Sequence, residues 1–131
     1  MSTSDLIAFL SARFDEDEQI AKSAIQGPWH TCGHDEECEA ADVIFGTSPI
    51  VSNRVVQVAN LEVAWQNREN AAHIVRHDPA RVLREVEAKR QLLDEAMSIW
   101  NSDAEGAGLT ILRLLALPHA DHQDYREEWR P

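Results

Sequence analysis

The sequence lacks any long hydrophobic run. None of its apolar stretches approaches the roughly 20 consecutive residues that a membrane-spanning helix requires. The opening stretch MSTSDLIAFLSARFDEDE also lacks the basic leader of a secretory signal peptide. Cysteine is scarce, with 2 residues in 131, and without an export signal these thiols are expected to be reduced. We therefore predict a cytoplasmic protein that does not bind membranes.

Basic residues are also in short supply. The chain has 12 Lys and Arg against 23 Asp and Glu, a net charge of −11. Because proteins gain affinity for nucleic acids by neutralising phosphates with Lys and Arg, direct binding of DNA or RNA is disfavoured. Residues 1–66 hold 11 acids and 3 bases, a net charge of −8. This acidic half either faces a basic partner or, more simply, keeps the protein soluble.

Recognisable catalytic signatures are missing as well. The chain contains no P-loop, no dinucleotide-binding glycine fingerprint and no nucleophile elbow. Its 131 residues suffice for one domain with a core that needs no metal or disulfide. The balance favours a protein without catalytic activity.

The residues that are present predict a single domain of the α+β class, mostly helical. Hydrophobic spacing indicates helices at 4–25, 69–76, 79–100 and 109–117, with a short C-terminal turn at 122–129. Short β-branched stretches within 29–60 predict two or three antiparallel strands. We expect this small sheet, inserted between helix 1 and the C-terminal helices, to pack on the helical layer. Residues 61–68 fit either a strand or a helix.

The segment HIVRHDP at 73–79 raises the question of whether its two histidines form a ligand site or flank a helix start. Asp is a strong N-cap, and Pro suits the first helical position, so Asp78 and Pro79 predict the start of a helix. Along 79–100, apolar residues recur every seven positions, with Arg90 inside one row. Arg90 either extends out of a monomer's core or pairs with an acid across a homodimer interface.

Zinc is the sharpest chemical hypothesis. The stretch HTCGHDEEC contains Cys32 and Cys38, and His73 and His77 lie four apart on the segment predicted to be helical. These four residues would make a tetrahedral Cys₂His₂ set. The spacing of the two cysteines is wider than usual, and Pro79 places His77 near a helix break. The simpler interpretation is free thiols in a loop and surface histidines.

Two catalytic hypotheses are weaker. The His-Asp dipeptides at 34–35 and 77–78 are compatible with a metal-dependent phosphohydrolase, but Asp78 is better explained as a helix cap. A nucleophilic cysteine with a nearby histidine is opposed by the acidic segment HDEECEAAD, which would raise the pKa of the thiol.

Four segments resemble a family of short proteins of unknown function from actinobacteria and their phages. They are DLIAFLSARFDEDEQIAKSA, GPW, HIVRHDPARVLREVEAKRQLLDEA and TILRLLALPHADHQDYREEWRP. The sequence departs from the family pattern at His119, where Tyr is usual, and at Gln123, where Pro is usual. The cysteines are not part of the pattern. The resemblance implies a bacterial or phage protein in the cytoplasm and no particular activity.

These observations together predict a non-catalytic interaction or regulatory protein. A protein partner is expected, with a homodimer as one possibility and no bound cofactor. Arg90, Trp65, Tyr125 and Trp129 are the candidate contact residues, because aromatic and Arg side chains dominate interface energetics. The alternatives are a small zinc-binding protein and an acidic mimic of nucleic acid.

Overall fold

A computed structural model of the chain describes residues 2–31, 43–46, 54–57, 64–102 and 104–131. The chain divides into two units, which are described separately. Unit 1 comprises residues 1–18 and 85–131, and unit 2 comprises residues 19–84. Cys32, Cys38 and much of the segment predicted to hold strands lie outside the described residues.

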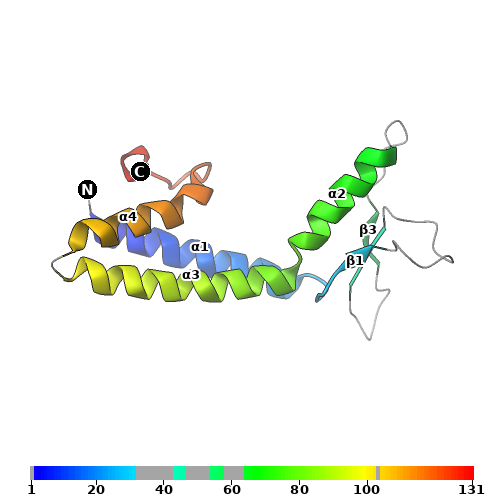
Figure 1. Ribbon diagram of the computed structural model, residues 1–131, viewed down its shortest axis with the longest axis horizontal. Helices are drawn as coiled ribbons and strands as arrows, with labels where there is room; N and C mark the ends of the chain where they lie inside the picture. Colours follow the sequence, from blue (N-terminus) through cyan, green and yellow to red (C-terminus); the bar gives the residue numbers. More distant parts are fainter. Residues whose placement is uncertain (1, 32–42, 47–53, 58–63, 103) are drawn as a thin grey trace. The chain divides into compact units, whose positions relative to one another are not determined.

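The described elements are mostly helices (Figure 1). The α-helices are α1 (Thr3–Ser23), α2 (Ala64–Arg76), α3 (Pro79–Trp100) and α4 (Glu105–Ala116). Two short 3-10 helices follow, η1 (Leu117–His119) and η2 (Glu127–Trp129). The strands are β1 (His30–Thr31), β2 (Val43–Phe45) and β3 (Arg54–Gln57). Among the described residues, no helix combines the length and apolar content that crossing a bilayer would need.

The predicted mostly helical content is confirmed, but the α+β class is wrong, because the described strands are too short to make the predicted sheet layer. The strands contain 2, 3 and 4 residues, and their pairing is antiparallel. A strand of ordinary length has about five or six residues. The described strands, in the order β1-β2-β3, contact α2 of the same unit but present too few side chains to form a separate β layer. The β-branched residues therefore indicated extended backbone but overstated the extent of pairing.

Two helices begin earlier than the hydrophobic pattern indicates. In α2, the buried residues Asn67 and Ala71 lie four apart, so the inner face continues back through a polar side chain. In α4, Gly106 and Gly108 belong to the helix instead of the preceding loop. A polar residue on an inner face and glycines within a helix both conceal the 3.6-residue period.

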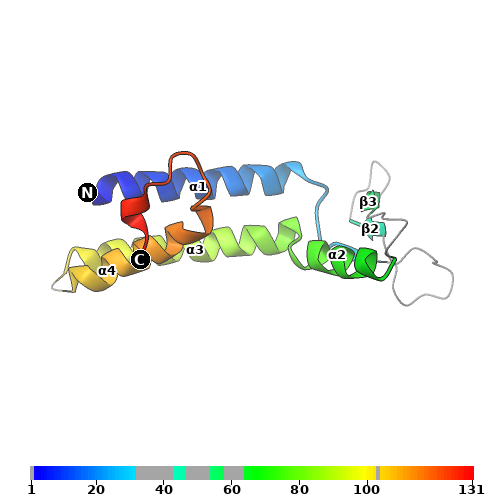
Figure 2. The same ribbon diagram turned by 90° about the horizontal axis from the view of Figure 1, so that it is seen from above.

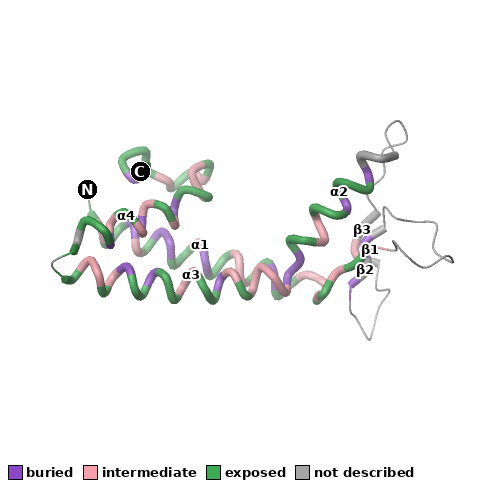
Figure 3. Tube along the Cα trace, in the orientation of Figure 1, coloured by how far each residue is buried: buried purple, intermediate pink, exposed green. Residues whose placement is uncertain are grey.

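Unit 1 is built on the apolar stripe of α1. Figures 1 and 2 show the unit 1 parts of α1 and α3 side by side, with α4 folded back against them. Buried positions recur at helical spacing on these helices (Figure 3). The buried side chains are Leu6, Phe9, Leu10 and Phe14 of α1, Val86, Leu93 and Ala96 of α3, Leu112 and Ala116 of α4, and Trp129. Their burial drives the association of the three helices.

Gly108 allows the main chain of α4 to contact the main chain at the end of α3. A Cβ atom placed on Gly108 would lie 2.6 Å from the amide nitrogen of Trp100 and 2.7 Å from the carbonyl oxygen of Ala96. These are main-chain atoms, so neither can move aside by a rotamer change. Gly106, two residues earlier, has no such neighbour within 4 Å.

Asp78 organises unit 2, and its predicted role as a helix cap is confirmed. Its Oδ1 accepts a hydrogen bond from the amide of Arg81 (2.8 Å), in the first turn of α3. Its Oδ2 accepts one from the amide of Trp29 (2.8 Å). The side chain is buried, and a Cβ atom on Gly27 would lie 2.6 Å from Oδ2. One carboxylate thus ties the segment after α1 to the start of α3.

Two substitutions of Asp78 should destabilise the protein to different degrees. Asp78→Ala removes both acceptors and should lower the free energy of unfolding by about 2–4 kcal/mol, since a cap is lost and a buried amide is left unpaired. Asp78→Asn keeps one oxygen and should cost about half as much. Urea-induced unfolding followed by circular dichroism measures both. Equal losses for the two variants would contradict the two-donor role.

The two glycines of α4 should respond in opposite directions to alanine. Gly108→Ala forces the main chains of α3 and α4 apart and should cost about 1–3 kcal/mol. Gly106→Ala fills open space and should stabilise the helix by about 0.5–1 kcal/mol. The same urea titration compares them, and Gly106→Ala serves as the matched control for helix propensity.

Candidate functional site

The C-terminal segment, residues 117–131, returns to the first half of α1. After α4 it continues as a series of tight turns, with hydrogen bonds from the amides of Ala120, His122 and Tyr125 to carbonyls three residues earlier. Trp129, in η2, is only 2% exposed and anchors the segment. The C-terminal turn predicted at 122–129 is in the structure a series of turns that ends in a 3-10 helix.

Five rings gather where this segment meets α1, and we call them the aromatic cluster. Phe9 lies at the centre, with its ring centroid 5.1 Å from that of Trp129, 5.7 Å from His122, 6.1 Å from Tyr125 and 6.3 Å from His119. Most pairs meet edge to face, the geometry that aromatic quadrupoles favour. The predicted contact residues Tyr125 and Trp129 both belong to this cluster.

Arg13 covers one side of the cluster. Its guanidinium carbon lies 5.3 Å from the centroid of the Phe9 ring, within cation–π distance. Its Nη1 donates to Nε2 of His122, and its Nε lies 3.2 Å from a carboxylate oxygen of Glu16. The charge of Arg13 is therefore held between a ring face, an imidazole and a carboxylate.

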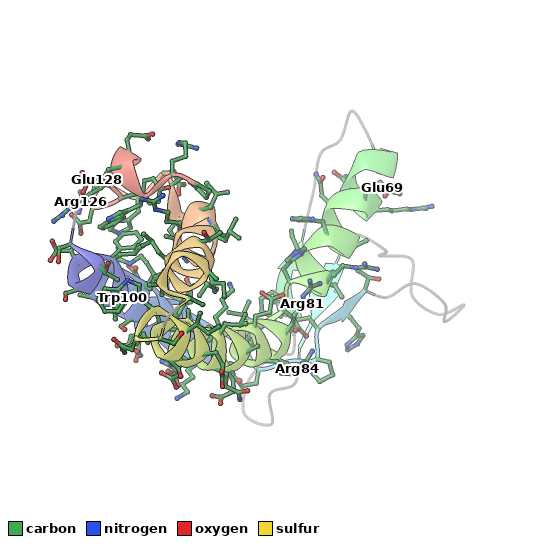
Figure 4. All side chains as sticks on the ribbon, turned by 60° about the vertical axis from the view of Figure 1, so that its left-hand side comes forward. Glu69, Arg81, Arg84, Trp100, Arg126 and Glu128 are labelled. Carbon is green, nitrogen blue, oxygen red and sulfur yellow. The ribbon has the colours of Figure 1, made fainter. Side chains whose placement is uncertain are left out.

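Arg126 covers a second ring of the cluster, that of Trp129. Its guanidinium carbon lies 5.3 Å from the centroid of the Trp129 ring. Its Nη1 lies 3.0 Å from Oδ2 of Asp5 and 4.0 Å from a carboxylate oxygen of Glu128. Figure 4 shows Arg126 and Glu128 on the C-terminal segment, beside the start of α1. The pair formed by Arg126 and Asp5 joins segments at the two ends of the chain.

A cavity of about 210 Å³ lies between α1 and the C-terminal segment, and we call it the tail pocket. Its lining combines an apolar floor with charged groups. The floor consists of Ala8, Phe9, Ala12 and Trp129, and the charged residues are Asp5, Arg13, Asp124 and Arg126.

Three polar atoms of the aromatic cluster are buried without a hydrogen-bond partner among the described residues. They are Nε1 of Trp129, the hydroxyl of Tyr125 and Nε2 of His119. Burial lowers the pKa of His119 below its ordinary value. The charge of Asp17 opposes this effect, and the nearby cations Lys89 and Arg13 add to it. The neutral imidazole is the form that the folded site prefers.

Arg90 lies outside the tail pocket but within unit 1. Its Nη2 lies 2.8 Å from Oδ1 of Asp15 and 2.5 Å from Oε2 of Glu18. Two hydrogen bonds raise the pKa of Arg90 above its ordinary value, and the bond to Glu18 has a larger effect than the bond to Asp15. The arginine in the heptad row thus connects α3 to the acidic run of α1 within one chain. Trp65 belongs to α2 in unit 2, and its side chain is not described.

The proposed zinc ligands are only partly within the described residues. His73 and His77 lie together at the C-terminal end of α2, with ring centroids 4.5 Å apart. Within the described ranges, no three His, Cys, Asp or Glu side chains converge to hold a metal ion. Asp78, which the phosphohydrolase hypothesis would use, instead accepts hydrogen bonds from two backbone amides.

Several residues of the tail pocket were not identified from the sequence. Phe9 and Arg13 lie four apart on α1, a spacing that places them on one face and suits a ring with a cation above it. Asp5 and Arg126 are 121 positions apart, and no local pattern links them. Of these two pairs, the sequence could therefore have indicated the pair of Phe9 and Arg13 but not the pair of Asp5 and Arg126.

A family model described as a family of unknown function (DUF6221) matches residues 3–131. No curated protein and no solved structure matches the sequence.

The half-buried imidazole of His119 should make stability depend on pH. Its pKa is lower in the folded protein than in the unfolded chain, so protonation favours unfolding. The stabilisation should be complete above the unfolded pKa of His, about 6.5, and should be lost as the pH falls through the lower folded pKa. In His119→Gln, thermal unfolding midpoints should change less between pH 7 and pH 5. His30→Gln is the control and should follow the wild-type profile.

Proposed function

The chain belongs to the DUF6221 family, whose function is unknown, and on that premise we propose that it is a non-catalytic interaction protein. Its binding site is the tail pocket, and its ligand is a polypeptide partner that inserts one aliphatic side chain. The observation that carries this proposal is the composition of the pocket. An apolar floor surrounded by paired charges matches the apolar core and polar rim of protein–protein interfaces.

The size of the pocket supports a side chain as the ligand. Sites for small molecules and cofactors usually enclose about 300–1,000 Å³. The tail pocket, at about 210 Å³, is smaller. It can accept one side chain of a partner, and the partner's backbone would then cross the charged residues around the floor.

The residue types of the pocket also support a protein partner. Trp and Arg are enriched among the residues that contribute most to binding energy at interfaces. Here Trp129 forms part of the floor, and Arg13 and Arg126 lie over the rings. Each guanidinium is already positioned by a carboxylate, so binding would immobilise few additional side chains.

The mimicry of nucleic acid is a weaker alternative. That hypothesis needs the acidic run of α1 to present free carboxylates. Asp15 and Glu18 instead hold Arg90, and Glu16 pairs with Arg13. The origin of the protein in an actinobacterium or a phage, and its location in the cytoplasm, remain predictions from the sequence.

Filling the pocket should abolish binding of the partner. Ala12 is exposed and lines the floor, so Ala12→Trp places an indole in the cavity without disturbing the buried core. The matched control is Ala88→Trp, at an exposed alanine of α3 in the same unit. Wild-type and variant proteins are used to capture partners from a lysate of the native host, with quantification by mass spectrometry.

The expected result is a partner that wild type and Ala88→Trp retain and Ala12→Trp loses by at least about tenfold, or 1.4 kcal/mol. Thermal unfolding of all three proteins checks that the fold is intact. If Ala12→Trp captures the same proteins in the same amounts as wild type, the pocket is not the binding site.

A further inference from the structure

Two exposed histidines lie side by side at the C-terminal end of α2, in unit 2. His73 lies in the last turn of α2, and His77 is the residue that follows the helix. Their ring centroids are 4.5 Å apart, and the ring planes are inclined by 39°. This pair is separate from the tail pocket, which belongs to unit 1.

A hydrogen bond fixes one of the two rings in a form that can bind a metal. Nδ1 of His77 lies 2.8 Å from the carbonyl oxygen of His73. Because a carbonyl can only accept, the proton is on Nδ1, and Nε2 carries the free electron pair. A backbone carbonyl performs this orienting role for many histidine ligands of metal ions.

The separation of the rings suits chelation of a single ion. Two imidazole nitrogens, each about 2.0–2.1 Å from a shared ion, place their ring centroids about 4.5–5 Å apart when they occupy neighbouring positions. The observed centroid separation of 4.5 Å falls at the short end of this range. Both residues are exposed, so an ion can reach them from solvent.

The surroundings favour an ion with high affinity for imidazole. The C-terminal end of a helix carries partial negative charge, which favours a cation there. Arg76 and Arg81 lie close by, with Nη1 of Arg81 donating to the carbonyl of Arg76, and they oppose binding through charge alone. Ca²⁺ and Mg²⁺, which prefer oxygen ligands, should therefore not bind, whereas Ni²⁺ and Zn²⁺ form strong bonds to imidazole nitrogen.

We propose that His73 and His77 form a two-histidine site for a divalent transition-metal ion. No third His, Cys, Asp or Glu joins them within the described part of the chain. Water or a ligand from a partner would complete the coordination. The site does not require the cysteines, and it is independent of the function proposed for the tail pocket.

Isothermal titration calorimetry of the metal-free full-length protein with NiCl₂ and with ZnCl₂ tests this site. All variants are made in a Cys32→Ser/Cys38→Ser background, which removes binding by thiolates. This background should bind one ion, and His73→Gln or His77→Gln should each weaken binding by at least about tenfold. His30→Gln, which removes an exposed histidine of β1, is the matched control and should bind as the background does.

Two further measurements complete the test. MgCl₂ should produce no binding, and acidification should weaken binding of Ni²⁺, because a protonated imidazole cannot coordinate a metal. Circular dichroism checks that each variant remains folded. The proposal is overturned if the cysteine-free protein binds no ion, or if both histidine variants bind as tightly as their background.

Discussion

Burial of the apolar stripe on α1 is the constraint on which unit 1 depends. Leu6, Leu10 and Phe14 are fully buried, and Phe9 on the same stripe lies at the centre of the aromatic cluster. Phe9 therefore belongs both to the buried stripe of α1 and to the floor of the tail pocket. The hydrophobic association that holds α1, α3 and α4 together thus also positions the central ring of the site.

The sequence predicts this fold well where one periodic signal is uninterrupted. The heptad spacing on α3 and the capping chemistry of Asp78 indicate a helix over 79–100, and α3 spans these residues. Elsewhere a local signal conflicts with a tertiary contact. Gly108 is typical of a loop but is needed where α4 meets α3, and short β-branched stretches suggest a sheet layer that the described strands are too short to form.

The candidate site was accessible from the sequence only in part. Tyr125 and Trp129 lie four residues apart, which indicates an aromatic face that packs against another part of the protein. Both belong to the aromatic cluster. Their partners could not be identified, because ring stacking on Phe9 and the ion pair between Asp5 and Arg126 arise from chain topology. Arg90 shows the same limit. Its heptad position places a charge within an apolar row, while the acids that pair with it lie on another helix.

The close approach of Gly27 to Asp78 links two positions that are distant along the chain. A side chain at residue 27 is excluded by the carboxylate oxygen that receives the amide of Trp29, not by any unusual backbone angle at Gly27. Among natural variants, the two positions should therefore change together. A shorter residue at position 78 would relieve the restriction to glycine at position 27, whereas a sequence that keeps the aspartate should keep the glycine.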